Sequence, residues 1–504
     1  MKRLIKTIFI TATLAMSACT PTPKTDETMN RTIRIGTEQF TASLDSALEW
    51  NGWFTVRYGI GETLFKVEDD MQIKPWLVSN AENIDAKTWK LTLRENIKFS
   101  DGTTMDAKSV VDNLHHIAQE NARAAFLQGA EYEIDGNTIT IKTVEPRATL
   151  LSDLSDPMFV MLNLSSKEDK ATMPIGTGPY KVKTFTADQE IVLEPNTNYW
   201  NGTPKLEEIT VTKMLEKETA ILALKNHELD AYTEMNPEGI KQLQDSDEFD
   251  IHTIPSSRVY SLYMNTEKLS DISLRKAIAK AIDKESIAKY LLDDTMTATD
   301  GPFTSDSEYA LPSSNVTSYN ETEAKQILES AGYVDTDGDG YVEKDGQNIS
   351  LTIAYYKRLS QEAIATELQS ALKKIGIQSE LQLHEGTKYL PNKEYDLGFY
   401  SMVTMPTGDP AYYLNALLSE GGTVNYSGYD NNAIQVLLKQ LNDSYDTKER
   451  KEIVKQIEEM LLASYSITYI GFNNLIFATR KELKNFVPHV TDYYQITVDL
   501  ELQS

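Results

Sequence analysis

The segment at residues 334–346, VDTDGDGYVEKDG, places three carboxylates at alternate positions and then a glycine. Asp335, Asp337 and Asp339 stand where a calcium-binding loop of the EF-hand type has its first ligands. That loop also requires a glutamate at its twelfth position and a helix after it, whereas this chain has Gly346 and then the pattern of a strand. The segment is therefore predicted to be a tight acidic turn. Structural calcium on the three aspartates stays open as the alternative.

Catalytic motifs are absent from the rest of the sequence. The chain contains no G-x-S-x-G, no Walker loop and no H-E-x-x-H. Of its 6 histidines only His115 and His116 are adjacent, and neighbouring residues on a helix point in different directions, so they do not form a metal-binding pair. The sequence therefore predicts that the protein is not an enzyme and needs no cofactor, with a hydrolase or an adhesin as the alternatives.

The elements on both sides of the acidic segment alternate between helix and strand. Asn320 is a good first cap and Gly332 a good stop for the preceding helix. After the turn, residues 349–356 alternate as in a strand, residues 360–376 have helical spacing, and residues 377–384 alternate again. This order predicts an α/β unit with a parallel pair of strands.

An earlier region combines a helix with antiparallel strands. Residues 88–100 alternate apolar and polar side chains and predict a half-buried strand. Residues 101–120 turn at an Asp-Gly pair and continue as an amphipathic helix, and residues 131–142 have the pattern of a hairpin. Mixed strand and helix signals therefore predict an α/β protein.

Residues 1–18 have the pattern of a secretory signal peptide, with basic residues, an apolar run from Ile8 to Met16 and small residues before Cys19. The run is too short to span a bilayer, which takes about 20 apolar residues. Cys19 is the only cysteine, so it cannot form a disulfide within the chain. Its position is similar to that of the lipidated cysteine of bacterial lipoproteins. Residues 19–30 are polar and rich in Pro and Thr, and we expect a flexible tether that holds an exported protein at a membrane surface.

The composition is that of an acidic globular protein. Of 504 residues 40% are hydrophobic and 25% charged, which suits two or three folded domains. The formal net charge of −26 argues against a nucleic acid partner, because that affinity comes largely from basic groups on phosphates.

Five segments, in this order and at about this spacing, resemble the large peptide/nickel class of bacterial extracellular solute-binding proteins. They are TWKLTLRENIKFSDGTTMDAKSVVDNL (88–114), PIGTGPYKV (174–182), EPNTNYW (194–200), LRKAIAKAIDKESIA (274–288) and AGYVDTDGDG (331–340). The resemblance covers the chain from about residue 32 to its C-terminus. It implies a monomer that captures a ligand between two lobes and delivers it to the permease subunits of an ABC importer.

The resemblance also implies a ligand loop at residues 400–414, with Tyr400, Thr404 and Asp409 as ligand-binding residues. Peptide-binding members carry an aspartate four residues before the loop proline, where this chain has Pro406. Nickel-binding members resemble this loop better, although the position where they have a metal-binding histidine is Ala411. The alternative is that the prolines and Asp409 only shape a turn.

Two further positions bear on the ligand. Arg123 aligns with an arginine that, in nickel-binding members, holds the carboxylates of a metal chelator, a role that suits the planar guanidinium. A second arginine of those members falls where this chain has Asp156. Trp50 and Trp53 are expected to line the cleft. The resulting prediction is a nickel (or other transition metal) chelate as cargo, with a short peptide as the alternative.

The predicted fold is α/β, with the two lobes of a periplasmic binding protein of type II, similar to cluster C, and an extra subdomain in the first lobe. Lobe I is expected at residues 31–260 plus 481–504, with 63–171 as the inserted subdomain, and lobe II at residues 261–480. The expected location is extracytoplasmic, lipid-anchored at the cell membrane.

Overall fold

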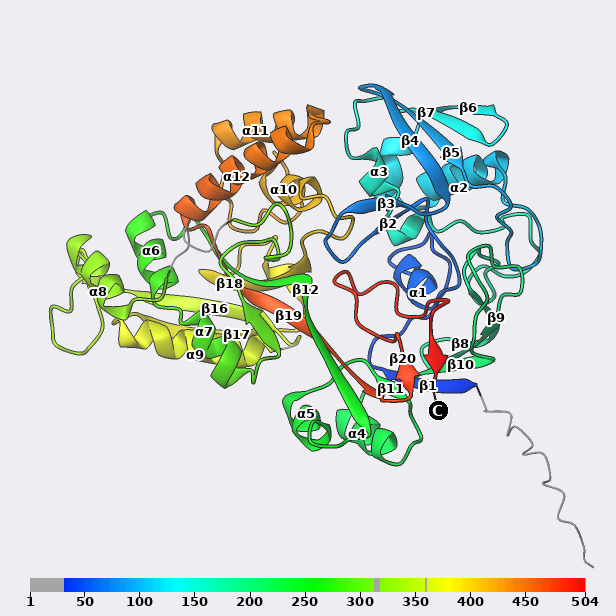
Figure 1. Ribbon diagram of the computed structural model, residues 1–504. Coiled ribbons are helices and arrows are strands. Elements are labelled where there is room, and N and C mark those ends of the chain that lie inside the picture. Colours follow the sequence, from blue (N-terminus) through cyan, green and yellow to red (C-terminus); the bar gives the residue numbers. More distant parts are fainter. Residues whose placement is uncertain (1–30, 312–317, 359, 504) are drawn as a thin grey trace, which may run out of the picture.

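The computed structural model describes residues 31–311, 318–358 and 360–503. The predicted signal peptide, the tether and Cys19 lie outside these residues. Two lobes lie side by side, joined by the long strands β12 and β19 (Figure 1). In the described part of the chain no helix has both the length and the apolar character that a membrane span requires.

One mixed sheet of eleven strands runs through both lobes. In spatial order its strands are β17 (Gln378–His384), β16 (Ser350–Tyr356), β18 (Leu397–Val403), β12 (Phe249–Met264), β19 (Ile467–Arg480), β11 (Ala231–Tyr232), β1 (Thr32–Thr37), β10 (Glu208–Lys213), β9 (Glu190–Pro195) and β8 (Tyr180–Thr186), with β13 (Met296–Ala298) beside β19. The strands β16 and β17 are parallel, as the strand–helix–strand pattern predicts.

The strands β12 and β19 pass from one lobe into the other. Their register shifts between Pro255 and Val259, so residues 256–258 form an irregular segment in β12. Before this segment β12 pairs only with β19, and from Arg258, the last residue of the segment, β12 also pairs with β18 of lobe II. The two lobes are therefore connected by a pair of strands whose pairing is interrupted at the boundary between the lobes.

Helices cover both faces of the lobe II strands. One face packs against α6 (Ile272–Lys280), α8 (Glu321–Ser330) and α9 (Gln361–Lys374), and the other against α10 (Ala411–Leu418), α11 (Asn432–Asp443) and α12 (Thr447–Ser464). The short helix α7 (Lys284–Ser286) follows α6 along the chain. Side chains alternate between the two cores along β16, with Ile353 in the first and Ala354 in the second.

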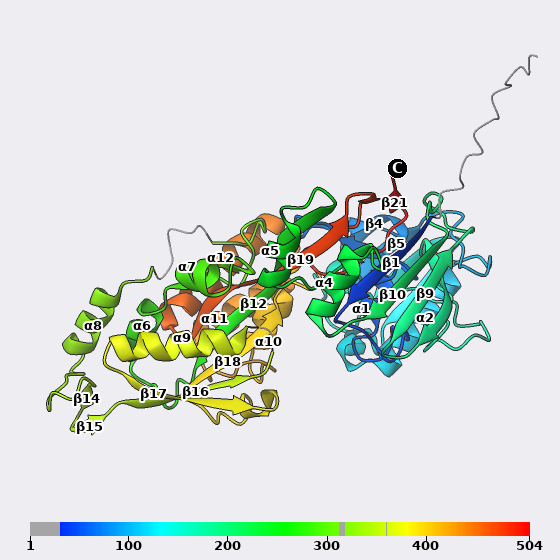
Figure 2. The same ribbon diagram turned by 90° about the horizontal axis from the view of Figure 1, so that it is seen from below.

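Lobe I surrounds the other half of the sheet with short helices and the C-terminal segment. These elements are α1 (Gly52–Arg57), α4 (Lys217–Lys225), α5 (Pro237–Leu243) and the pair β20 (Leu483–Lys484) and β21 (Glu501–Leu502). Ile33 and Ile35 of β1 pack against Phe486 and Leu500, so the C-terminal segment completes the core of this lobe. Figure 2 shows β1, β10 and β9 side by side at this end of the molecule.

The subdomain has its own antiparallel sheet, in the order β4 (Val78–Asp85), β5 (Thr88–Leu93), β7 (Thr138–Lys142) and β6 (Glu131–Asp135). It packs against α2 (Ala107–Glu120) and α3 (Leu150–Asp153), and the small pair β2 (Phe65–Val67) and β3 (Ile73–Pro75) lies beside it. The predicted strand, helix and hairpin of this region are confirmed by β5, α2 and the β6–β7 pair.

The flanks of the acidic turn also follow the sequence pattern. Asn320 accepts a hydrogen bond from the Glu323 backbone N–H and begins α8, as predicted. Ser360 precedes α9, but its side chain makes no capping hydrogen bond. After the acidic turn the chain forms the hairpin of β14 (Glu343–Lys344) and β15 (Gln347–Asn348), and no EF-hand exit helix follows.

Candidate functional site

A cavity lies between the lobes, where the paired strands β12 and β19 pass from one lobe into the other. Its volume is about 50 Å³, which leaves room for a few water molecules. It is lined by the irregular segment of β12, by β19, by the C-terminal segment and by single residues of both lobes, namely Gln39, Trp53, Ser256, Ser257, Arg258, Arg358, Val403, Asn473, Leu475, Val490, Thr491 and Asp492.

The topology of lobe II brings two arginines to this cavity. The parallel strands β16 and β18 end at the same edge of the sheet, and Arg358 follows the end of β16. Arg258 of β12 pairs in register with Val403, the last residue of β18. Ligands of open α/β sheets bind at this edge, beyond the carboxyl ends of the strands.

Neither arginine forms a salt bridge with the residues that the structure describes, although Asp492 is close enough to Arg258 to attract its charge. Arg258 is half-buried, and its Nη1 donates a long hydrogen bond of 3.4 Å to the Ser401 carbonyl. Burial lowers the pKa of Arg258 to about 10, and repulsion from Arg358 acts in the same direction. Two neighbouring guanidinium groups whose nearest carboxylate, Asp492, already pairs with Arg57 are an unfavourable arrangement that a bound carboxylate would relieve.

Polar atoms around Arg258 also lack partners. Tyr356 and Tyr400 are close enough to Arg258 to interact with it electrostatically. In the described part of the chain the Tyr356 hydroxyl and the hydroxyls of Ser257 and Ser401 are buried and make no hydrogen bond. Because buried polar groups are normally satisfied, these hydroxyls indicate a place for a polar ligand.

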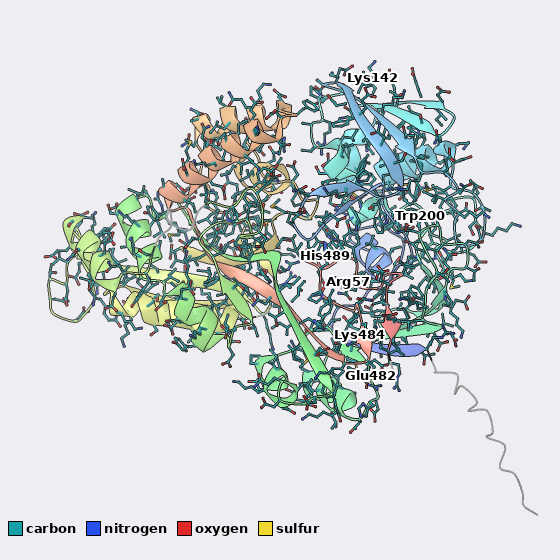
Figure 3. All side chains as sticks on the ribbon, in the orientation of Figure 1. Arg57, Lys142, Trp200, Glu482, Lys484 and His489 are labelled. Carbon is teal, nitrogen blue, oxygen red and sulfur yellow. The ribbon has the colours of Figure 1, made fainter. Side chains whose placement is uncertain are left out.

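Asp492 is the one acid among the described residues that line this cavity, and it is already engaged. The Arg57 Nη2 lies 2.5 Å from the Asp492 Oδ2, and Gln495 donates to the Oδ1 at 2.9 Å. Figure 3 shows Arg57 and the nearby His489 on the side of lobe I that faces lobe II. The cavity is therefore electrostatically dominated by the two unpaired arginines.

Arg123 is not among the residues that line this cavity, and it has partners of its own. Its Nη1 donates to the buried Asp156 carboxylate at 2.8 Å and its Nη2 to the Glu49 carbonyl at 2.9 Å. The guanidinium lies 3.9 Å from the centre of the Trp50 ring. Asp156, which stands where the resemblance expected a second arginine, thus neutralises Arg123.

The predicted loop residues Thr404 and Asp409 also have internal partners. Thr404 is fully buried and its hydroxyl donates to the Pro302 carbonyl at 2.6 Å. Both carboxylate oxygens of Asp409 accept from the Arg450 Nη2 at 2.6 Å, and one accepts from the Ala411 backbone N–H. These contacts shape the loop, and a ligand role for the two residues stays a prediction.

The structure brings two of the predicted aromatic residues to the arginine cavity. Trp53 lines it directly, and Tyr400 lies beside Arg258. The Trp50 ring is tilted against that of Trp53, with ring centres 5.9 Å apart, and Trp50 remains 48% exposed. The Trp53 ring contacts the ring of Tyr493 in lobe I. The Tyr493 hydroxyl in turn donates a hydrogen bond of 3.1 Å to the Pro406 carbonyl of lobe II, so the two lobes are in contact here.

Two larger cavities have other linings. One cavity of about 390 Å³ lies between the subdomain and the predicted ligand loop at residues 400–414. Its lining includes Arg147, Asp153, Asp409 and Tyr412. Another of about 220 Å³ lies within lobe I, between Glu62, Tyr199 and His489. In the first, Asp153 and Asp409 already pair with arginines, and the second does not involve lobe II. The arginine cavity therefore remains the better candidate.

Two α/β lobes joined by crossing strands, with the candidate site between them, define a binding protein of the periplasmic type. The model of the bacterial extracellular solute-binding proteins, family 5 Middle, matches residues 72–425. The chain belongs to this family, and it is a solute-binding protein and not an enzyme.

Similar proteins cover almost the whole chain. The Staphylococcus aureus nickel-binding protein NikA is 28% identical over 96% of this chain and 96% of its own. The Bacillus subtilis dipeptide-binding protein DppE is 24% identical over 92% of this chain and 91% of its own. Among solved structures, a nickel ABC transporter protein from Bacillus halodurans has a TM-score of 0.83 and 28% identity over 94% of this chain and all of its own. NikA from Staphylococcus aureus, in complex with Ni(L-His)2, has a TM-score of 0.77 and 25% identity over the same share of each chain.

Proposed function

We propose that this protein is the substrate-binding component of an ABC importer and that its cargo is a chelate of nickel or another transition metal. The observation that carries the proposal is the pair Arg258 and Arg358, which line the inter-lobe cavity and form no salt bridge with the described residues. Carboxylates of an amino-acid chelator would bond to their planar guanidinium groups. The similarity to proteins that are named for nickel binding supports this choice of metal.

The metal ligands would come mostly from the chelator. No histidine lies among the described residues that line the arginine cavity. Ala411, at the loop position where the resemblance implies a metal-binding histidine, is 2% exposed and has no donor atom in its side chain. Nickel favours imidazole and other nitrogen ligands, which histidine as a chelator supplies together with the carboxylate for the arginines.

Calorimetry tests this division of roles. Nickel salt alone is expected to bind weakly or not at all, and nickel with L-histidine is expected to bind clearly. L-histidine without metal is the control, and its heat must be far smaller. Equal binding of the bare nickel ion and of the chelate would contradict the proposal, because it would require metal ligands from the protein.

A short peptide is the second candidate cargo, and similarity to dipeptide- and oligopeptide-binding proteins supports it. Its carboxylate would suit the same arginines. Its α-amine would need an acid, yet Asp492, Asp409 and Asp156 are each paired with an arginine. A library of di- to pentapeptides that raises the melting temperature without metal, while all nickel chelates fail, would favour the peptide.

Cargo capture is proposed to use hinge closure at residues 256–258 of β12 and at the facing residues of β19. Contacts such as that between Tyr493 and Pro406 exist only when the lobes are close, so a ligand bound by both lobes shifts the population toward the closed form. The permease subunits would recognise that form. The proposed lobe I comprises residues 31–260 and 481–504, with the subdomain 63–171 inserted, and lobe II comprises residues 261–480. Residues 475–480 of β19 pair with the lobe I half of β12, so the strand crosses the lobe boundary before its end.

The proposed location is outside the cytoplasm, with the chain held at the membrane by a lipid on Cys19. A Cys19→Ala variant is expected to leave the membrane fraction, because the acyl chains supply the membrane affinity. Detergent phase partitioning of the variant and of the wild type measures this. The lipid anchor would be refuted if the variant stayed wholly with the membranes.

A further inference from the structure

The acidic loop between α8 and β14 gathers more carboxylates than the three aspartates that its sequence pattern suggests. One oxygen from each of Asp335, Asp337, Asp339 and Glu343 lies within 4.8 Å of the others. The aspartates are exposed, whereas Glu343 is 6% exposed. Four carboxylates in so small a space repel one another unless a cation lies between them.

Glu343 has a buried oxygen without a partner. Its Oε2 accepts from the backbone N–H of Thr336 at 2.7 Å and from the Thr336 hydroxyl at 2.6 Å. Thr336 stands between the first two aspartates of the loop, so the Glu343 carboxylate is directed into the loop. Its Oε1 is buried and has no hydrogen-bond partner in the described chain. An ionised oxygen in that position is costly unless a ligand bonds to it.

The fold itself brings Glu343 to the aspartates. The backbones of Val334 and Glu343 exchange two hydrogen bonds of 3.0 Å, which close the loop at its base. Counted from Asp335, Glu343 is the ninth residue, a position from which EF-hand loops also contribute a ligand, often through water. Gly340, the sixth, has a φ of +92° that favours glycine, as the sharp turn of such a loop requires.

We propose that this loop is a calcium site, formed by Asp335, Asp337, Asp339 and Glu343 together with a backbone carbonyl at Tyr341, the seventh position. The side-chain donors are all oxygen atoms, which suit a hard divalent cation and disfavour nickel. Calcium accepts the six to eight ligands and irregular geometry that such a loop and water can offer, whereas magnesium requires a compact octahedron. Gly346 at the twelfth position does not prevent binding, because Glu343 supplies the additional carboxylate from the hairpin.

Calcium at this loop would hold one end of lobe II together without touching the cargo site. The Val342 N–H donates to the Gly376 carbonyl just after α9, and Lys344 donates to Asp271 before α6. The loop thus joins the ends of α8, α9 and α6. In Figure 2 the hairpin β14–β15 lies at the end of lobe II that is farthest from lobe I.

Titration of the EGTA-treated protein with calcium chloride tests the site. We expect saturable binding by calorimetry and a higher melting temperature with calcium than with EGTA. Glu343→Gln and Asp337→Asn are each expected to weaken calcium binding at least tenfold and to remove most of the thermal shift. Asp306→Asn, which changes an exposed acid of the same lobe, is the matched control and should bind as the wild type does.

Asp337→Asn keeps the assay meaningful if the buried substitution at Glu343 prevents folding, because the Asp337 side chain is exposed. The site would be disproved by absent binding at millimolar calcium, or by equal binding in Asp337→Asn and the wild type. Nickel–histidine affinity, measured without calcium after the EGTA has been removed and again with calcium, should differ by no more than a few-fold. Failure of the cargo assay alone would refute the proposed function and leave the calcium site intact.

Discussion

Replacement of Arg258 and Arg358 together by alanine is expected to abolish measurable binding of nickel–histidine, and each single substitution to cost about 1.5–3 kcal/mol, the typical contribution of a charged hydrogen bond. The reason is that no other cation is left to hold the chelator's carboxylates in the arginine cavity, as far as the described residues go. Calorimetry of the wild type, Arg258→Ala, Arg358→Ala and the double variant measures the loss. Arg258→Lys is expected to restore only part of the affinity, because lysine keeps the charge and loses the two-pronged geometry.

Stability measurements separate a binding role from a structural one. Since neither arginine pairs with an acid in the described chain and the two repel each other, Arg258→Ala should leave the melting temperature of the ligand-free protein unchanged or slightly higher. Arg123→Ala is the informative comparison. It breaks an ion pair with the buried Asp156 and should lower stability more than affinity. A tenfold affinity loss in Arg123→Ala, with normal binding in Arg258→Ala, would return the carboxylate-binding role to Arg123.

Local patterns in the sequence predict the elements better than they predict the sheet. The Asn320 cap, the period of the strand at 349–356 and the parallel pairing with 377–384 all depend on neighbouring residues, and the structure confirms them. The central pairings are different, because β1 pairs with β10 and β11, which lie more than 170 residues away. No local period encodes which distant strand becomes the neighbour.

Contacts between residues far apart in the sequence also decide which residues form the candidate site. The resemblance directs attention to Arg123 and Asp409, but their partners Asp156 and Arg450 are 33 and 41 residues away and only the fold brings them together. Arg258 and Arg358 carry no motif. They converge because β12 and β16 lie on the two sides of β18. The position of Arg358 just after a predicted parallel strand was the one sequence signal for the site.

In the loop at 334–346 some features follow from neighbouring residues and others only from the tertiary fold. Its turn residues and the following strand pattern correctly predict that no EF-hand helix follows. The count to the twelfth position overlooks Glu343, since its importance depends on burial and on the hairpin that returns it to the aspartates. Residue spacing gives the order of ligands along a loop, whereas burial and free lone pairs come from tertiary packing.

The stability of this protein is expected to fall as the pH rises from 7 to 9, mainly because of Glu458 on α12. Its side chain is fully buried, and neither carboxylate oxygen has a partner in the described chain. Burial raises the pKa of Glu458 to about 9, with a further increase from Glu459. At neutral pH the folded protein therefore keeps this carboxyl protonated, while the unfolded chain ionises it at its ordinary pKa of 4.5.

The direction of the pH effect follows from proton binding. Between pH 4.5 and about 9 the folded state binds the Glu458 proton more tightly than the unfolded state does, so the free energy of unfolding decreases with pH. The slope approaches about 1.4 kcal/mol per pH unit, which amounts to a loss of about 2–3 kcal/mol from pH 7 to 9. Glu62 contributes little to this window, because burial raises its pKa only to about 7.

Glu458→Gln is expected to remove this slope, because glutamine has nearly the same shape and stays neutral at every pH. Urea denaturation at pH 7, 8 and 9 measures the free energy of unfolding of both proteins. Glu459→Gln, which changes the exposed neighbour, is the matched control and should keep most of the wild-type slope. Parallel curves for Glu458→Gln and the wild type would mean that Glu458 is ionised in the folded state at neutral pH. In that case a buried cation or water would have to reach the inner face of α12, which packs into the apolar core of lobe II near Tyr469.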